Sequence, residues 1–362
     1  MSSPGPYLGR VERLRAALRR RKLTAALITH LPNVRWLCGF SGSAGSLLVS
    51  ARDVVFFSDF RYRAQSRREV RGARLFEYTG GSVEAIAAAV RHARVARLGF
   101  EADRMTVATH ADSAAAMPGV ELVPLRGTVQ GLRAVKDSRE LVHIRRALAI
   151  AGRALASGTR RLAGRSEIAV ASRLLEQIRR EGGDDESFPT IVASGPRAAL
   201  PHGLPAGRII GGGDLVVIDF GVRTSGYCCD ITRTYSPVKW DKKAKEIYRV
   251  VLEAQRAALS VIGPGVKGSD VDAAAREVIE RAGHAEHFGH GTGHGVGLEV
   301  HEQPVLSPRS GDTLQPGMVV TVEPGIYVEN FGGVRIEDMV LVTETGREVL
   351  SRRIPKLLDH EG

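Results

Sequence analysis

Three histidines and several glycines share one short segment, HGTGHGVGLEVHE, which spans residues 290 to 302. Imidazole nitrogens bind divalent metals, so this segment can offer an imidazole to a metal centre. Glycine has no side chain to pack and loses much backbone freedom on folding, so the segment does little to stabilise a helix or strand. We therefore expect another group to lie close to its backbone.

Two aspartates lie on the arms of a predicted hairpin, DLVVIDFGVRTSGYCCDITRTY, residues 214 to 235. If the turn is centred between Thr224 and Ser225, Asp219 and Asp230 face each other. Directly opposed residues of antiparallel strands have Cβ atoms roughly 4.5–5.5 Å apart, and like charges at that distance repel each other. A pair of metal ions bridged by carboxylates would compensate for this repulsion.

A second hairpin region, 318 to 344, repeats the arrangement with glutamates. Glu323 and Glu337 face each other across a loop centred on Asn330, provided that no bulge shifts the register. Four carboxylates carry a formal charge of minus four, so with one neutral imidazole they would balance two divalent cations. This ligand set suits Mn²⁺, Co²⁺, Zn²⁺ or Fe²⁺ better than a structural zinc, which prefers cysteine and histidine.

The elements that must position these residues fall into two halves. From about 8 to 128, short apolar strands alternate with amphipathic helices, which predicts a smaller α/β domain. Beyond it, helices mixed with antiparallel hairpins predict an α+β domain. Its first helix should begin at Asp137, with Glu140 three residues later in the spacing of a capping box. We place the two domains at 1–128 and 129–362.

Composition limits the classes of protein to consider. The chain has 362 residues, of which 43% are hydrophobic, enough for a sizeable buried core. The net charge of +11 comes from scattered arginines without interleaved aromatic residues, so we expect no nucleic-acid binding. The first thirty residues carry arginines where a signal peptide would be apolar, and no run of eighteen apolar residues occurs. We expect a cytoplasmic protein that binds no membrane.

Four motifs occur in a characteristic order: DFGVRTSGYCCDITRTY, GHGTGHGVGLEVHEQP, VEPGIYV and GGVRIED. They resemble the proline-peptidase branch of the "pita-bread" metallopeptidases, whose members include aminopeptidase P, prolidase and methionine aminopeptidase. NVRWLCGFSGSAG and FFSDFRYRAQ also look like the amino-terminal domain of the first two. The resemblance implies a creatinase-like α/β domain followed by a pita-bread catalytic domain.

The resemblance also implies roles for individual residues. The implied metal ligands are Asp219 on one metal, His294 and Glu323 on the other, and Asp230 and Glu337 as bridges. Glu323 would in addition move the proton of the attacking water. The residues implied to contact the substrate or brace the site are His202, His290, His301 and Arg335.

The implied activity is hydrolysis of the Xaa-Pro bond at the amino terminus of small peptides by a hydroxide that bridges two divalent metals. Mn²⁺ is the expected metal, with Co²⁺ or Zn²⁺ as alternatives, and a homodimer is the expected assembly. The glycines of 289 to 297 would then let the backbone approach metal and substrate closely.

We favour an Xaa-Pro aminopeptidase, because GYCCDITRT and GHGVGLEVHEQP look like the shorter bacterial proteins of that kind. An Xaa-Pro dipeptidase (prolidase) is the alternative within the family, since the motifs do not separate the two. A non-catalytic binding protein on the same fold is the alternative from another class. Such a protein would be free to lose ligands, whereas this chain keeps the complete set.

Overall fold

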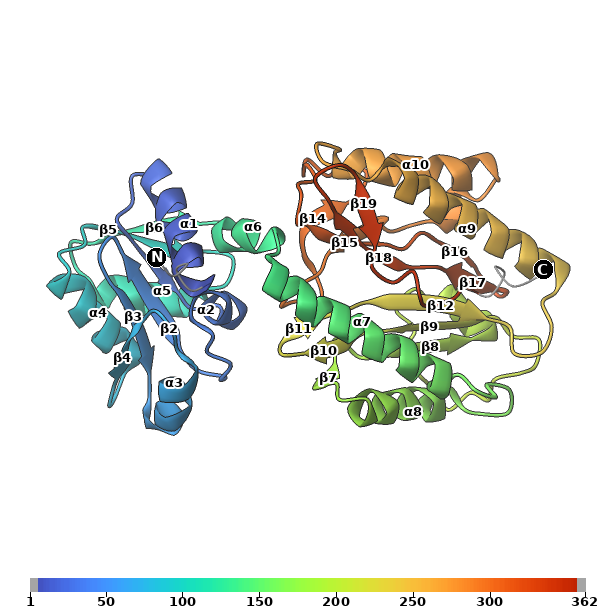
Figure 1. Ribbon diagram of the computed structural model, residues 1–362, viewed down its shortest axis with the longest axis horizontal. Coiled ribbons are helices and arrows are strands. Elements are labelled where there is room, and N and C mark those ends of the chain that lie inside the picture. Colours follow the sequence, from blue (N-terminus) through green and yellow to red (C-terminus); the bar gives the residue numbers. More distant parts are fainter. Residues whose placement is uncertain (1–5, 357–362) are drawn as a thin grey trace. The chain divides into compact units, whose positions relative to one another are not determined.

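The computed structural model describes residues 6–356 (Figure 1). The chain divides into two compact units, Met1–Arg133 and Ala134–Gly362. The division falls beyond residue 128, where we expected the first domain to end, because the short helix α6 (Thr128–Ala134) belongs almost entirely to the first unit.

A six-stranded mixed sheet forms the centre of the first unit, in the order β4-β3-β2-β1-β5-β6. Its strands are β1 (Ala25–Ile28), β2 (Ser46–Ser50), β3 (Val54–Ser58), β4 (Arg74–Glu77), β5 (Arg97–Glu101) and β6 (Glu121–Leu125). The other helices of the unit are α1 (Pro6–Arg20), α2 (Leu31–Cys38), η1 (Phe60–Tyr62), α3 (Arg63–Glu69), α4 (Ser82–His92) and α5 (Val107–Ala116). Leu27, Leu48 and Val55 of the sheet share a buried core with Ile86 and Val90 of α4. The expected α/β layer arrangement is confirmed.

The second unit mixes antiparallel strands with two pairs of long helices. Its helices are α7 (Ser138–Gly158), α8 (Glu167–Arg180), η2 (Gly195–Ala199), α9 (Lys242–Val261), α10 (Gly268–Arg281) and η3 (Ala285–His287). The strands of its first half are β7 (Asp185–Glu186), β8 (Ile191–Ser194), β9 (Val216–Phe220), β10 (Val222–Thr224), β11 (Tyr227–Cys228) and β12 (Ile231–Tyr235). The strands of its second half are β13 (Gly293–Gly295), β14 (Glu302–Leu306), β15 (Val319–Val322), β16 (Gly325–Val328), β17 (Gly332–Arg335), β18 (Asp338–Val342) and β19 (Arg347–Val349).

The strands of the second unit lie between the two helix pairs, with α7 and α8 on one side and α9 and α10 on the other (Figure 1). One buried core joins α7 and α8 to residues such as Ile218 of β9 and Val319 of β15. The other joins α9 and α10 to residues such as Val217 and Val320. Adjacent residues of one strand therefore pack into different cores, because successive side chains point to opposite faces of a sheet. The expected α+β architecture is confirmed.

Helix α7 begins where the sequence predicts. The Asp137 side chain accepts hydrogen bonds from the backbone amides of Arg139 and Glu140, and the Glu140 side chain accepts one from the backbone amide of Asp137. This reciprocal capping box satisfies amides that no helical carbonyl can reach.

The register of the first hairpin differs from the predicted one. Asp219 pairs with Thr232 rather than with Asp230. The turn is centred one residue later than we assumed, on Ser225 and Gly226, which have φ values of 49° and 80°. Two successive residues with positive φ define the tight turn preferred in hairpins, and the glycine adopts this conformation readily.

The shift moves the partner of Asp219 by two positions, and residues two apart on a strand point to the same face. Asp219 and Asp230 therefore become diagonal neighbours on one face instead of directly opposed residues. They remain close enough to share a metal.

The register of the second hairpin is as predicted. Val322 pairs with Asp338, just before Glu323 in the chain, and Gly325 pairs with Arg335, just after it. Both pairs are centred on Asn330, so Glu323 and Glu337 lie opposite each other. No net bulge separates the two ladders, so the prediction of the register is confirmed.

The chain around residues 351–356 is fastened to strand β18. Asp338 accepts hydrogen bonds from Ser351 and Arg233, and the Lys356 ammonium lies 2.6 Å from its carboxylate. Arg233 also donates to the carbonyls of Ile354 and Pro355, at 2.8 and 3.1 Å. This buried network holds in place the strand that follows Glu337. Within residues 6–356 no helix is long and apolar enough to cross a bilayer.

Candidate metal centre

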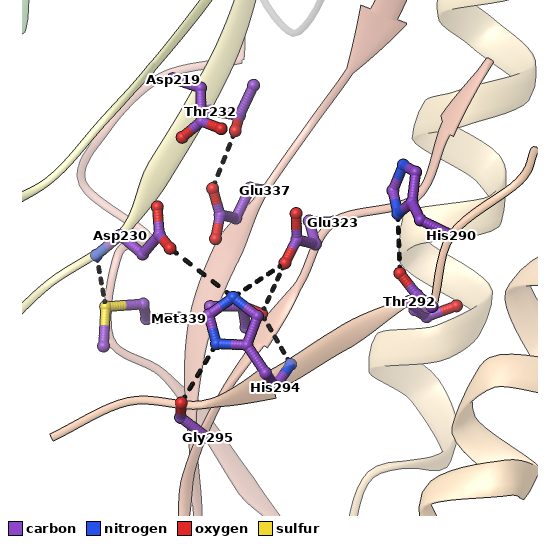
Figure 2. Close-up of polar contacts among 12 residues, drawn as sticks. Asp219, Asp230, Thr232, His290, Thr292, His294, Gly295, Glu323, Glu337 and Met339 are labelled. Atoms are coloured by element: carbon purple, nitrogen blue, oxygen red, sulfur yellow. Dashed lines mark hydrogen bonds and ion pairs between the residues drawn. The ribbon is translucent and has the colours of Figure 1, made fainter. Parts of the chain in front are cut away.

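Three acidic side chains from the two hairpins meet at one buried point. Carboxylate oxygens of Asp219, Asp230 and Glu337 lie within 4.8 Å of one another (Figure 2). One oxygen of each carboxylate is buried without a hydrogen-bond partner among the described residues. An unpaired buried acceptor is costly, and three in one cluster indicate that a cation belongs between them.

His294 and Glu323 lie beside this cluster. His294 Nε2 is 3.2 Å from Glu323 Oε1 and 3.7 Å from Asp230 Oδ2 (Figure 2). His294 Nδ1 lies 3.1 Å from the carbonyl of Gly295, which can only accept, so Nδ1 carries the proton. Nε2 is therefore free to bind a metal, in the usual arrangement of a ligating imidazole.

Burial and mutual repulsion perturb the protonation of these carboxyl groups. Burial raises the pKa of Asp230 well above its ordinary value, and the charges of Glu337 and Asp219 raise it further. The pKa of Glu337 is raised well above its ordinary value for the same reasons, burial first and then Glu323 and Asp219. Without a cation, the two carboxyl groups therefore resist ionisation.

The pKa of Glu323 moves the other way. Burial acts to raise it, but the hydrogen bond and charge of His294 outweigh burial and bring the pKa to about 2. For His294, burial acts to lower the pKa, and Glu323 overcomes it and raises the pKa above the ordinary value. The two side chains form an ion pair when no metal separates them.

The donor set fits a pair of hard or borderline divalent ions. The five residues that the sequence singled out supply four carboxylates and one imidazole, and the structure brings them together (Figure 2). Carboxylate-rich sets of this kind suit Mn²⁺, Co²⁺ or Zn²⁺ in catalytic sites. The buried cysteines lie outside the cluster, which rules them out as its ligands.

Arg335 braces the cluster from β17. Its guanidinium donates to Asp219 Oδ2 and to the Tyr327 hydroxyl, at 2.6 Å each, and to Thr232 Oγ1 at 3.1 Å. Thr232 in turn donates to Glu337 Oε2 at 2.9 Å. The positive charge thus offsets part of the negative charge of the cluster and fixes the orientation of Asp219.

Tyr327 was missed by the sequence reasoning. Its hydroxyl accepts from Arg335 and lies 2.9 Å from His290 Nε2. His290 Nδ1 lies 2.8 Å from the carbonyl of Gly291 and must donate to it, so Nε2 accepts from the tyrosine. A signal was present, because Tyr327 lies four residues after Glu323, an even offset that favours the same face of an extended strand.

A cavity of about 360 Å³ opens beside the cluster. Polar residues that line it include His202, His290, His301, His294, Glu323 and Arg335. Its apolar wall consists of Phe188, Ile191, Pro201 and Val305. The cavity therefore offers an apolar surface next to metal-binding and hydrogen-bonding groups, as small-molecule sites usually do.

The three histidines of the cavity are not equivalent. His301 packs edge-on against His294, with ring centroids 4.4 Å apart, and burial followed by His294 lowers its pKa. Burial also lowers the pKa of His290, so both rings are neutral near pH 7. His202 and His301 form no hydrogen bond to the described residues, whereas both nitrogens of His290 are engaged.

The glycines of the histidine segment approach neighbouring strands, and two of them, Gly291 and Gly293, also line the cavity beside the acidic cluster. A Cβ atom on Gly293 would lie 2.1 Å from the carbonyl oxygen of Thr321, and one on Gly295 would lie 2.1 Å from that of Gln303. The expectation of a close approach is confirmed, but for these two glycines the close group is neighbouring backbone. The expectation that these glycines approach metal or substrate stays a prediction; Gly293 lines the cavity, while β13 lies between β14 and β15.

Helix α10 holds the other end of the segment. Asp272 Oδ1 accepts from the amide and the hydroxyl of Thr292, at 3.0 and 2.9 Å. Arg276 forms two hydrogen bonds with Asp272 and donates to the carbonyls of Phe288 and His290, at 3.0 and 2.9 Å. We call these two residues the α10 clamp. Sequence alone gave no sign of it, because the partners are backbone atoms of a distant loop.

Comparisons with known proteins bear on this site. The chain matches the model of Metallopeptidase family M24 over residues 142–344 and that of the Creatinase/Prolidase N-terminal domain over residues 10–135. It is 43% identical over 350 residues to peptidase YqhT of Bacillus subtilis (strain 168), covering 96% of this chain and 99% of that one.

Two solved structures share the fold at substantial identity. A Xaa-Pro dipeptidase from Bacillus anthracis matches with a TM-score of 0.94 and 40% identity, covering 97% of this chain and 98% of that chain. An X-Pro aminopeptidase from Thermotoga maritima MSB8 matches with a TM-score of 0.86 and 36% identity, covering 93% and 97%. The resemblance and the two-domain fold that it implied are confirmed. The chain belongs to metallopeptidase family M24, and its amino-terminal unit belongs to the creatinase/prolidase type.

Proposed function

We propose that this protein is a metal-dependent peptidase that hydrolyses the Xaa-Pro bond of small peptides, with Xaa-Pro dipeptides as its main substrates. The observation that carries the proposal is the buried cluster of Asp219, Asp230 and Glu337 with unpaired oxygens, next to His294 and Glu323. A cluster of this composition beside a partly apolar cavity suits metal-assisted hydrolysis of an apolar peptide.

The preference for dipeptides revises our expectation from the motifs, which favoured an aminopeptidase that accepts longer peptides. Of the two solved structures compared above, the dipeptidase is the more similar in both sequence and fold. Cleavage of longer Xaa-Pro-Yaa peptides remains the alternative within the same proposal.

The proposed ligands are the residues that the family resemblance implies. Asp219, Asp230 and Glu337, together with His294 and Glu323, would hold two divalent ions. Bound there, the ions would polarise the scissile carbonyl and lower the pKa of water. We propose Mn²⁺, with Co²⁺ or Zn²⁺ as alternatives, because the donors are mainly oxygen.

The side chains around the metals have separate tasks in this proposal. Glu323, which lies beside His294 at the cluster, can take a proton from water and pass it to the leaving nitrogen. His301 and His202 have free ring nitrogens facing the cavity, so they can donate to the developing oxyanion or to the substrate carboxylate. His290 instead presents its ring to the substrate, since its nitrogens bind Gly291 and Tyr327.

The apolar wall would select proline. A proline nitrogen bonded in an Xaa-Pro linkage carries no hydrogen, and its ring fixes φ. Recognition must therefore rely on ring shape, and Phe188, Ile191 and Val305 supply apolar surface at the cavity. Arg335 would orient the site rather than bind substrate, because four of its five N–H groups donate to Asp219, Tyr327, Thr232 and the carbonyl of Pro201.

The test is hydrolysis of Xaa-Pro dipeptides and Xaa-Pro-Yaa tripeptides by metal-free protein reconstituted with Mn²⁺, Co²⁺ or Zn²⁺. Asp230→Asn should abolish cleavage, whereas Asp112→Asn, the same change at an exposed site on α5, should leave it intact. Cleavage of both peptides at similar rates would make the enzyme an aminopeptidase. No cleavage with any metal would refute the proposal and favour a non-catalytic binding protein.

The expected homodimer is part of the proposal and rests on the family resemblance. Sedimentation velocity of the metal-loaded protein measures it directly. A single species with the mass of one chain would show that the second copy is not needed.

A further inference from the structure

Two histidines outside the proposed centre lie against each other where α10 ends. Gly283 follows the helix with a φ of 78°, and the single 3₁₀ turn η3 comes next. Side chains three residues apart eclipse each other in a 3₁₀ turn. His284 and His287 have this spacing, and their Nδ1 atoms are 3.2 Å apart, with ring centroids separated by 5.2 Å.

We propose that His284 and His287 form a second metal site that binds one transition-metal ion such as Zn²⁺, Ni²⁺ or Cu²⁺ through the two Nδ1 atoms. Two nitrogens that each lie about 2.0–2.1 Å from one tetrahedral zinc ion are roughly 3.3 Å from each other. The observed separation of 3.2 Å already matches this value. The metal would replace the single proton that the two nitrogens now share.

The surroundings leave the site accessible and favour the neutral form of His284. Both side chains are half-buried, and Glu286 between them is exposed. Burial, followed by the charges of His287 and Lys243, lowers the pKa of His284, and a neutral ring is the form that binds metals. Lys243 lies over the ring of Phe331, 4.4 Å from its centroid, so it already has a partner of its own. Water or the Glu286 carboxylate can complete the coordination.

The donor set separates this site from the carboxylate cluster. Two imidazoles and no fixed carboxylate favour Ni²⁺, Cu²⁺ and Zn²⁺, which bind nitrogen far better than Mn²⁺ does. Neither histidine lines the cavity of the candidate metal centre. The two sites use different residues, and the inference does not depend on the proposed peptidase activity.

The experiment counts zinc bound per chain. In an Asp230→Asn background, which impairs the carboxylate cluster, the protein is dialysed against Zn²⁺ with excess Mn²⁺, and the metals are measured by mass spectrometry. About one equivalent of zinc should remain and should be lost on His284→Gln, on His287→Gln and on the double change. His92→Gln, which alters an exposed histidine at the end of α4, should leave zinc binding unchanged.

A second measurement, of peptidase activity, tests whether the histidine variants are still folded. With the carboxylate cluster intact and Mn²⁺ bound, His284→Gln should hydrolyse peptides as fast as the unaltered protein, which shows that it is folded. Equal zinc content in the Asp230→Asn protein with and without both histidines would overturn the proposal, whatever the peptidase assay shows.

Discussion

Removal of the metal should lower the free energy of unfolding of the second unit, and the number of unpaired carboxylate oxygens in the cluster determines by how much. Three buried carboxylate oxygens, one each on Asp219, Asp230 and Glu337, have no partner among the described residues. A buried polar group left unsatisfied costs about 1–3 kcal/mol, so the three together cost roughly 3–9 kcal/mol. For a unit of this size each kcal/mol lowers Tm by about 2–4 °C, so chelation should lower Tm by roughly 10–30 °C.

The loss should also depend on pH. The folded-state pKa values of Asp230 and Glu337 lie well above the ordinary values of 3.8 and 4.5. Groups with raised pKa values contribute stability that is complete below the ordinary values and is lost as pH rises through the folded-state values. The free energy of unfolding of the metal-free protein should therefore fall between pH 5 and pH 8. It should fall by more than that of a variant in which both groups are neutral.

The matched variant is Asp230→Asn combined with Glu337→Gln, which keeps the shapes and removes both charges. Calorimetry of metal-free samples measures how much Tm changes between pH 5 and pH 8, in the unaltered protein and in the double variant. At pH 8 the metal-free variant should melt above the metal-free unaltered protein and should gain nothing from added Mn²⁺. The reasoning is refuted if chelation leaves the Tm of the unaltered protein unchanged at pH 8, or if both proteins respond equally to pH.

Three further changes test the supports of the site. Tyr327→Phe removes the hydroxyl from which His290 accepts a hydrogen bond. A loss of about 1–3 kcal/mol should lower kcat/KM by roughly 5- to 150-fold. An unchanged kcat/KM would mean that the ring is held by packing alone. Arg276→Lys breaks the α10 clamp and should lower kcat/KM by roughly 100-fold. The circular dichroism spectrum should stay native, and a loss of helix signal would point to misfolding instead. Gly293→Ala places a Cβ 2.1 Å from the carbonyl of Thr321 and should cost about 1–3 kcal/mol in urea unfolding, whereas a stability equal to that of the unaltered protein would show that β13 can shift.

Local rules explain which parts of the fold could be predicted. The capping box at Asp137 depends on residues three apart, and the register of the second hairpin follows from a loop centred on Asn330, whose φ is 60°. The turn of the first hairpin was misplaced because we centred it before Ser225. Gly226 was the clue, since its positive φ of 80° marks the second residue of the turn.

The nature of the missed contacts explains the rest. The four acids of the candidate centre could be named from their residue types and their places on two hairpins, whereas the choice of His294 among the histidines followed from the family resemblance. The α10 clamp could not, since Asp272 and Arg276 bind mainly backbone carbonyls and an amide of the loop 12 to 20 residues later, and backbone groups carry no residue-type signal. Helix α2 was also missed, because Val34, Trp36 and Leu37 are all buried and leave no polar face to reveal the helical period.

The fastening of Asp338 ties the candidate metal centre to the chain around residues 351–356. Asp338 directly follows Glu337 and is held by Ser351 and Lys356. A chain truncated before residue 351 would lose both partners and leave the buried carboxylate of Asp338 with fewer of them. We expect such a truncation to loosen the position of Glu337 although it removes none of the proposed ligands.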